Sequence, residues 1–348
     1  MKRVTAIILT FLITATLLPG CTAPGTQSDG KTSIVCTIFP QYDWVKQILG
    51  DRADDFEITL LLSGRADMHS FQPTVQDFAK ISSCDLLIYV GGESDAWVEQ
   101  TLRDATNKNM LTVNLFERLG DAAKEEELLE GMTAGDADSG DDSLSGDDSH
   151  RGGDSHGDGD SHSDDDEIEY DEHVWLSLGN AVVFCRAIAE AISQLDADNT
   201  VAYNDNLNSY IVRLDALDSE YRAMVGSAPV KTLLFGDRFP FRYLTDDYGL
   251  VPFAAFPGCS AETEASFDTF IFLANKIDEL GLAYVLVTES ADRSVARAII
   301  GITIEKNQKI LVLDSMQSVS PDDIRNGTTY ISIMESNLSI LTEALRDP

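Results

Sequence analysis

The chain has 348 residues, a length that fits one large domain or two ordinary ones. Its 43% of hydrophobic residues supply enough apolar material for a substantial core. The formal net charge of −34 argues against a nucleic-acid or anionic-membrane partner, because both of these surfaces repel negative charge.

The start of the chain is typical of a secretion signal. The charged "MKR" precedes the apolar "VTAIILTFLITATLL", which is short for a membrane span. The segment ends in "LPGC", which resembles a bacterial lipobox, so we expect residues 1–20 to be removed and Cys21 to carry a lipid. An ordinary signal peptide cut nearby is the alternative. Residues 21–31 are expected to be a flexible tether, which would hold the protein on the outer face of the bacterial cell membrane.

Short β-rich runs alternate with helical stretches over residues 32–196, the predicted N-terminal lobe. Continuous apolar strands separated by helices indicate a parallel sheet covered on both faces. The predicted strands are "TSIVCTIF", "FEITLLL", "DLLIYVG" and "MLTVNLF", and the predicted helices are Tyr42–Ile48, a stretch from Thr74, Ala96–Thr106 and Gly179–Leu195.

A long amphipathic helix is predicted over residues 197–226, because apolar residues recur there at three- and four-residue steps. A second alternation follows over residues 227–348, the predicted C-terminal lobe. The fold is therefore predicted to be α/β, with two Rossmann-like lobes, each with a parallel sheet, joined by a long rigid helix. The strands of the second lobe are expected at "VKTLLFG", "LVPFAAF", "AYVLVT" and "KILVLD", and its helices at Phe241–Asp247, Glu264–Leu280, Ala291–Lys306 and Ile331–Leu345.

An acidic segment, residues 121–172, interrupts the first lobe with 21 acidic and 2 basic residues. It is poor in apolar side chains and is expected to be a disordered loop. The triplet "DSH" occurs in it three times and supplies His150, His156 and His162. A loose accessory metal collector of imidazoles and carboxylates is favoured over a plain solvated linker.

The two remaining histidines, His69 and His173, lie at the borders of predicted elements. His69 follows a predicted strand, and the carboxyl ends of parallel strands are where open sheets bind ligands. His173 lies where the chain re-enters the fold. Each histidine, considered alone, suits either a structural role or a ligand role.

The cysteines after Cys21 lack the C-x-x-C spacing of zinc or redox sites and are expected to be free thiols. Three of them lie among apolar residues and are expected to pack as small hydrophobic groups. These three are Cys36, Cys84 and Cys185. The remaining cysteine is Cys259.

Six motifs occur in order along residues 32–348, and as a set they resemble the metal-binding subunit of zinc and manganese ABC importers. They are "FPQYDWVKQI", "ADMHSFQPT", "DLLIYVGGESDAWVEQ", "DEHVWLSLGNA", "TESADRSVARAI" and "ILVLDSM". The resemblance implies one metal in the cleft between the lobes. It assigns the metal ligands to His69, His173 and Asp314.

The chain departs from the family pattern at the ligand expected after the first strand of the second lobe. The family has a histidine or glutamate there, whereas this chain reads "LLFGDRFPFRYLTDDYGL". Asp237 is the nearest metal-competent side chain and is predicted to be the further ligand, although the adjoining Arg238 offers it an ion pair instead. Water or a loop histidine are the other candidates to complete the shell.

The resemblance implies high-affinity capture of Zn²⁺ outside the cytoplasm and its delivery to a membrane ABC permease and its ATPase. We expect a monomer. We also expect no enzymatic activity, because the sequence lacks the H-E-x-x-H motif of zinc hydrolases. Manganese or iron as the cargo of the same importer class, or a surface metal-binding adhesin, are the alternatives. Two histidines with two carboxylates favour manganese, whereas the histidine-rich loop favours zinc.

Overall fold

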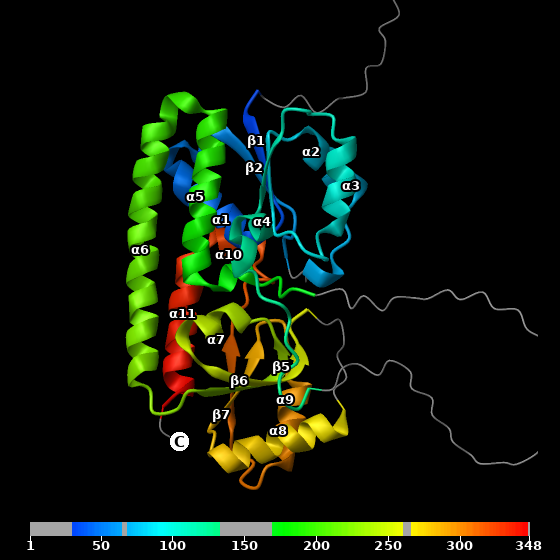
Figure 1. Cartoon of the computed structure of the whole chain (residues 1–348), viewed down its shortest axis with the longest axis vertical. Helices are drawn as coiled ribbons and strands as arrows, with labels where there is room; N and C mark the ends of the chain where they lie inside the picture. The colour runs from blue at the N-terminus through cyan, green and yellow to red at the C-terminus, as the bar shows by residue number, and fades with distance from the viewer. Residues whose placement is uncertain (1–29, 65–67, 133–168, 260–265, 347–348) are drawn as a thin grey trace, which may run out of the picture. The chain divides into compact units, whose positions relative to one another are not determined.

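The computed structural model describes residues 30–64, 68–132, 169–259 and 266–346. Within them the chain forms two parallel β-sheets of four strands each, and all their strands and helices belong to one unit, Thr32–Pro348 (Figure 1). The predicted architecture of two α/β lobes is confirmed. The predicted lipidation residue Cys21 and the loop histidines His150, His156 and His162 lie outside the described residues.

The sheet of the first lobe has the order β2-β1-β3-β4, with all neighbours parallel. The central strand β3 is buried at every position, as its unbroken apolar sequence predicts. The strands are β1 Thr32–Cys36, β2 Phe56–Leu60, β3 Leu86–Tyr89 and β4 Leu111–Asn114, and the helices are α1 Phe39–Leu49, α2 Val75–Ser83, α3 Ala96–Asp104, α4 Leu115–Leu119 and α5 Leu178–Leu195.

Helix α1 begins three residues before the expected Tyr42. Pro40 suits the first turn of a helix because its missing N–H has no intrahelical partner there. The side-chain oxygen of Gln41 then accepts hydrogen bonds from the backbone N–H groups of Thr37 at 2.9 Å and Ile38 at 3.2 Å. This local capping satisfies donors ahead of the helix and moves its start upstream.

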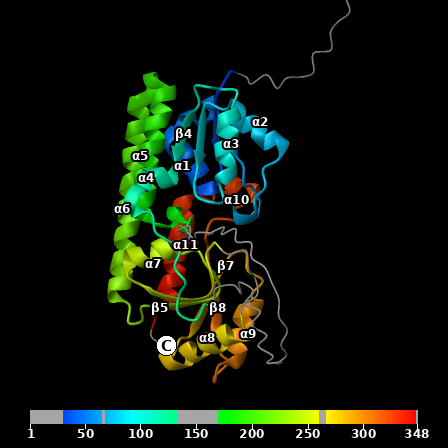
Figure 2. The ribbon, with the colours of Figure 1, turned by 45° about the vertical axis from the view of Figure 1, so that its right-hand side comes forward.

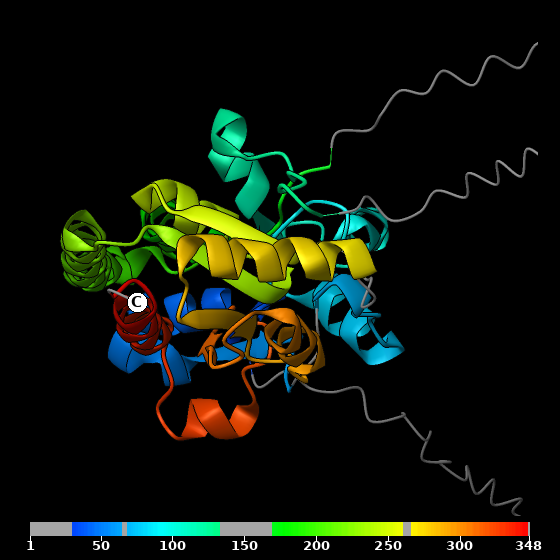
Figure 3. The same cartoon turned by 90° about the horizontal axis from the view of Figure 1, so that it is seen from below.

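Helix α6, Thr200–Ser227, is the predicted linking helix and has 28 residues. At about 1.5 Å per residue it is about 42 Å long. It packs against α5 and α1 of the first lobe and against α11, the last helix (Figure 2). The view from below shows α6 and α11 side by side (Figure 3).

The second sheet has the order β6-β5-β7-β8 and is also parallel. Its strands are β5 Thr232–Phe239, β6 Val251–Pro257, β7 Tyr284–Thr288 and β8 Lys309–Leu313, and its helices are α7 Arg242–Tyr248, α8 Phe267–Leu280, α9 Ser294–Ile302, α10 Pro321–Arg325 and α11 Tyr330–Ala344. The described residues also form short 3₁₀ helices, which are η1 Gly50–Asp55, η2 Met68–Ser70, η3 Gly120–Ala122, η4 Val174–Leu176 and η5 Ala197–Asn199.

Two of the differences from the prediction in this lobe have a local cause. Helix α9 ends at Ile302 rather than near Lys306, because the Thr303 hydroxyl donates to the Ile300 carbonyl and accepts the Lys306 N–H. Helix α10 was not predicted; its N-terminus has Ser320 and Asp323 in a reciprocal capping box.

The two lobes share one hydrophobic core. It contains residues of both sheets together with α1, α5, α6 and α11. Tyr330 of α11 is fully buried, its ring centroid is 5.1 Å from that of Trp44, and its backbone N–H donates to Asp43 at 3.0 Å. A smaller cluster lies between the second sheet and α8 and α9.

The four described cysteines are free thiols, as predicted, and Cys36, Cys84 and Cys185 are buried. Within the described residues, no helix is both long and apolar enough to cross a bilayer.

Candidate metal centre

His69 lies in η2, after β2, at the carboxyl edge of the first sheet. Its Nδ1 is 2.9 Å from the Ser94 hydroxyl and 3.2 Å from Oε2 of Glu172. Glu172 in turn accepts the Ser94 N–H at 2.8 Å and also the Ser94 hydroxyl. Burial acts to raise the pKa of Glu172, but the hydrogen bonds from His69 and Ser94 outweigh it and lower that pKa. An ionised carboxylate therefore orients the His69 ring.

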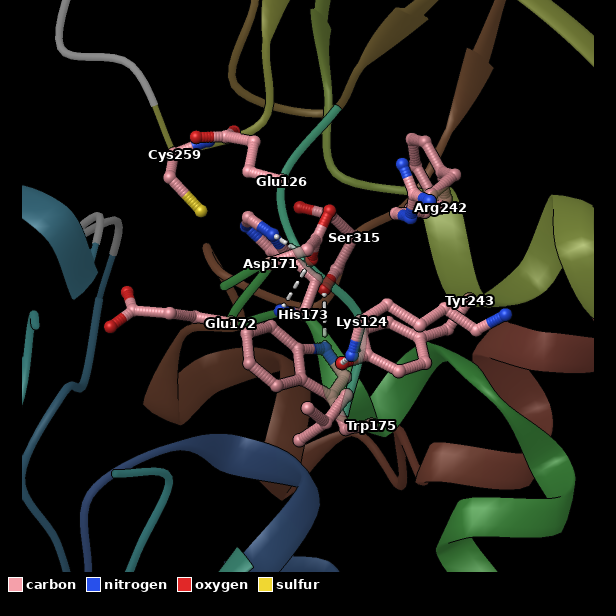
Figure 4. A network of polar contacts seen from close by, with 12 residues as sticks. Lys124, Glu126, Asp171, Glu172, His173, Trp175, Arg242, Tyr243, Cys259 and Ser315 are labelled. Atoms are coloured by element: carbon pink, nitrogen blue, oxygen red, sulfur yellow. Dashed lines mark hydrogen bonds and ion pairs between the residues drawn. The ribbon is translucent and has the colours of Figure 1, made fainter. Parts of the chain in front are cut away.

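His173 directly precedes η4 and is fully buried. Its Nδ1 is 3.1 Å from Oδ1 of Asp171, which also accepts the His173 backbone N–H at 2.8 Å. The His173 ring lies 5.3 Å from the Trp175 ring, centroid to centroid. Figure 4 shows Asp171, Glu172 and His173 on one segment, with the hydrogen bonds between Asp171 and His173.

The two imidazoles face each other through their Nε2 atoms, which are 3.2 Å apart. Each Nδ1 lies beside a carboxylate, so we assign the ring proton of each neutral histidine to Nδ1. Both Nε2 atoms then present lone pairs to the same point, an unfavourable arrangement unless a cation lies between them. Metal-binding histidines usually donate their other N–H to a carboxylate or carbonyl in this way.

A third metal-competent side chain, Cys259, belongs to the same group. The ligand atoms of His69, His173 and Cys259 all lie within 4.8 Å of one another. In the described part of the chain, no other group of three or more histidine, cysteine, aspartate or glutamate side chains brings its ligand atoms so close together. Cys259 follows β6, so it lies at the carboxyl edge of the second sheet. That position was the available signal for a ligand role, and the absence of C-x-x-C spacing concealed it.

The two predicted carboxylate ligands do not belong to this group. Asp237 lies within β5, and its Oδ2 accepts hydrogen bonds from Thr288, at 3.0 Å from the N–H and 2.5 Å from the hydroxyl. Asp314 follows β8, and its Oδ1 accepts the Met316 N–H at 2.7 Å. Burial, followed by the negative charge of Glu289, raises the pKa of Asp314 to about 7. The structure thus brings the two predicted histidines together and leaves both predicted carboxylates in other hydrogen bonds.

Gln317 is a further residue that the sequence did not single out. Its Nε2 is 3.2 Å from the His173 Nε2, and its backbone N–H donates to Glu289 at 3.1 Å. The Gln317 side-chain oxygen is buried and has no hydrogen-bond partner among the described residues. A flip of the amide exchanges its nitrogen and oxygen. Gln317 can therefore direct either an N–H donor toward the His173 Nε2 or a carbonyl oxygen toward a metal bound there.

The described ends of the acidic segment lie beside this centre. Glu125 and Tyr170 form an antiparallel bridge, and the Asp171 N–H donates to the Lys124 carbonyl at 2.9 Å. The Lys124 N–H donates to the Tyr243 hydroxyl of the second lobe at 2.9 Å. Residues 121–132 and 169–172 therefore have hydrogen-bonded structure, although the whole segment was expected to be disordered.

The fold and the facing histidines define a two-lobed binding protein with a metal-competent centre. Among solved structures, the Zn(II)-bound ZnuA-like domain of Streptococcus pneumoniae AdcA matches with a TM-score of 0.65 and 25% identity, covering 91% of this chain and 100% of that one. The sequence model of the family "Zinc-uptake complex component A periplasmic" matches residues 34–344. The chain belongs to this family.

Two curated relatives are similar over most of the chain. The high-affinity zinc uptake system protein ZnuA of Bacillus subtilis is 30% identical over 338 residues, which cover 96% of this chain and 94% of the relative. The zinc-binding lipoprotein AdcA of Streptococcus pneumoniae serotype 4 is 28% identical over 319 residues, which cover 91% of this chain and 56% of the relative. The chain thus spans about half the length of the curated streptococcal AdcA relatives that it matches.

Proposed function

We propose that this protein binds Zn²⁺ outside the cytoplasm and delivers it to a membrane ABC permease, which its ATPase drives. The observation that carries the proposal is the 3.2 Å approach of the His69 and His173 Nε2 atoms, each oriented by a carboxylate. Membership of the zinc-uptake family, and relatives whose names specify zinc, support zinc as the cargo.

His69 and His173 are the proposed protein ligands of the tight site. Neutral imidazole nitrogen is a preferred ligand of zinc, and the two carboxylates supply the outer contacts that fix each ring. Asp314 remains a prediction from the resemblance, and Asp237 remains a prediction from its place where the chain departs from the family pattern. His150, His156 and His162 are proposed to form a weaker accessory tract.

The protein is proposed to act as a monomer, anchored by a lipid on Cys21, and to catalyse no reaction. Transfer of an ion to a permease requires binding and release but no bond-making chemistry. A zinc hydrolase would need, besides the metal, an open coordination position and a general base close to it. Zinc-dependent turnover of model esters or peptides would contradict this part of the proposal.

The proposal is tested by zinc titration of the purified chain against a competing chelator. We expect one tight zinc per molecule, and loss of that site in His69→Ala and in His173→Ala. His150→Ala, which removes a histidine of the proposed accessory tract, is the matched control and is expected to retain the site. Asp237→Ala and Asp314→Ala in the same titration test the two predicted carboxylates. Tight zinc binding that survives both core histidine substitutions would contradict the proposal.

Delivery is tested separately in cells. A strain that lacks the gene is expected to grow poorly in chelated medium and to be rescued by added zinc. The wild-type gene should restore growth, whereas the His173→Ala gene should not. Rescue by manganese and not by zinc would assign a different cargo.

A further inference from the structure

Two imidazoles leave a zinc ion short of protein ligands, since zinc in proteins usually has four ligands and at least three from the protein. Among the histidine, cysteine, aspartate and glutamate side chains of the described residues, the third ligand atom that lies close to both imidazole nitrogens is the Cys259 sulfur. It reaches them from the other lobe, because His69 and His173 belong to the first lobe and Cys259 to the loop after β6. Figure 4 shows the Cys259 sulfur directed toward the segment that carries Asp171 and His173.

The backbone at Cys259 is held in place by both lobes. Its N–H donates to Oε1 of Glu126 at 2.8 Å, and the Glu126 N–H donates to the Glu169 carbonyl at 2.8 Å. The segment that begins at Glu169 continues directly to His173. Cys259 is therefore fixed relative to His173 by a short chain of hydrogen bonds.

The residue before Cys259 restricts this loop further. A Cβ atom placed on Gly258 would lie 2.6 Å from the Phe239 carbonyl oxygen, so a side chain there would force the backbone to move. Gly258, directly after β6, thus packs tightly against the end of β5. This close approach fixes the backbone immediately before Cys259.

We propose that Cys259 is the third protein ligand, so that the centre binds its metal through two imidazole nitrogens and one thiolate. This inference rests on the proposed function of the same site. On binding, the Cys259 S–H bond breaks, the sulfur forms a bond to the metal, and the proton passes to solvent. No electron transfer is involved.

A thiolate ligand changes which metal the centre prefers. Thiolates are soft ligands that suit zinc, whereas manganese prefers carboxylate, carbonyl and water oxygens. The predicted ligand set of two histidines and two carboxylates favoured manganese on its chemistry alone. Replacing a carboxylate by Cys259 removes this conflict and makes the protein ligands themselves select zinc over manganese.

The test uses Co²⁺ as a spectroscopic substitute for zinc in the full chain. A thiolate bound to Co²⁺ gives an intense near-ultraviolet charge-transfer absorption, which imidazole and carboxylate ligands lack. We expect this band in the wild-type protein and in Cys84→Ser, and its loss in Cys259→Ser. Cys84 is the matched control because it is a buried thiol whose sulfur contacts the Ile81 carbonyl, an interaction that serine can retain.

Zinc affinity and selectivity give the second readout. Loss of a ligand should weaken zinc binding by more than the roughly 10–100-fold that outer-shell changes cause. Cys259→Ser should therefore lose at least that much affinity, and Cys259→Asp should lower the ratio of zinc to manganese affinity. Circular dichroism and thermal unfolding without metal establish that each variant is folded.

The outcomes separate this inference from the proposed function. If the charge-transfer band is absent from the cobalt-loaded wild type, Cys259 is not a ligand. If Cys259→Ser binds zinc as tightly as the wild type while His69→Ala does not, Cys259 is not a ligand and the histidine site stands. If His69→Ala and Cys259→Ser both bind zinc as tightly as the wild type, both the Cys259 inference and the proposed function are contradicted.

Discussion

The hydroxyl of Tyr330, the first residue of α11, donates a 2.7 Å hydrogen bond to the carbonyl oxygen of Trp175. Trp175 lies two residues after His173, and its indole N–H donates to the Ser315 carbonyl at 2.9 Å. The segment that carries one proposed metal ligand is thereby hydrogen-bonded to two parts of the second lobe.

The first prediction concerns this tyrosine. Tyr330→Phe removes the hydroxyl and leaves a buried carbonyl without that partner, so the free energy of unfolding should fall by about 1–3 kcal/mol. Urea unfolding of the metal-free protein measures the change. Tyr210→Phe is the control, because the Tyr210 hydroxyl is buried without a hydrogen-bond partner among the described residues. We expect Tyr210→Phe to be neutral or stabilising. Equal losses in the two variants would show that the Trp175 contact contributes nothing.

The second prediction concerns the carboxylate that orients His69. Glu172→Gln keeps the shape of the side chain but replaces the charged acceptor near the His69 Nδ1, so zinc affinity should fall by about 10–100-fold. Chelator competition measures the affinity. Glu125→Gln changes an exposed residue of the segment that is bridged to Tyr170 and should leave the affinity unchanged. Unaltered binding in Glu172→Gln would mean that the His69 ring needs no charged partner.

The third prediction concerns the acidic segment. Deletion of residues 135–165 removes His150, His156 and His162 but retains the paired flanks around Glu125 and Tyr170. We expect the deleted protein to keep one tight zinc and to lose only weaker additional binding. Isothermal titration with excess zinc distinguishes the two classes of site. Disappearance of the tight site would show that a loop histidine belongs to its ligand set.

The fourth prediction concerns pH and stability. Burial raises the pKa of Asp95 to about 7, although Asp95 accepts backbone N–H groups from Val90 at 2.8 Å and Gly91 at 3.1 Å. Between pH 4 and 7 the folded protein therefore holds a proton at Asp95 that the unfolded chain has lost. The contribution of Asp95 to stability must accordingly decline as the pH rises through this range.

Asp95→Asn tests this sign, because its amide oxygen can accept the same two hydrogen bonds without titrating. The variant should match the wild type near pH 4 and exceed it at pH 8 by a few kcal/mol, roughly the size that a shift of this kind implies. Chemical unfolding of metal-free protein at several pH values provides the comparison. A difference that is constant with pH would indicate an ordinary Asp95 pKa.

The parts of the fold that the sequence predicted are those where local pattern and tertiary packing agree. The unbroken apolar run of β3 and the regular stripe of α6 led directly to a buried strand and a linking helix. The early start of α1 depends on the two backbone hydrogen bonds that one side chain, that of Gln41, accepts. The five-residue α10 is too short to have a recognisable period. Such features follow from single contacts, which composition and periodicity do not encode.

The residues of the candidate site also fall into those that the sequence predicted and those that it did not. His69 and His173 were singled out because each falls within a motif at the end of an element. Cys259 follows a strand, but it was passed over because it lacks C-x-x-C spacing. The proximity of Cys259 and Gln317 to His173 depends, moreover, on how the second lobe packs against the first. Gln317 is 144 positions from His173 in the chain, yet the side chains are 3.2 Å apart. A single sequence carries no signal for such a pairing.

The hydrophobic core that the two lobes share has a consequence for how the protein melts. Because α1, α5, α6 and α11 pack into one continuous cluster with both sheets, neither lobe can expose its interior without disrupting the other. We therefore expect one cooperative unfolding transition rather than two. A ligand that binds only the native state adds RT ln(1 + [L]/Kd) to the stability of the whole cooperative unit. Zinc bound at a few side chains between the lobes should accordingly raise the melting temperature of the entire molecule.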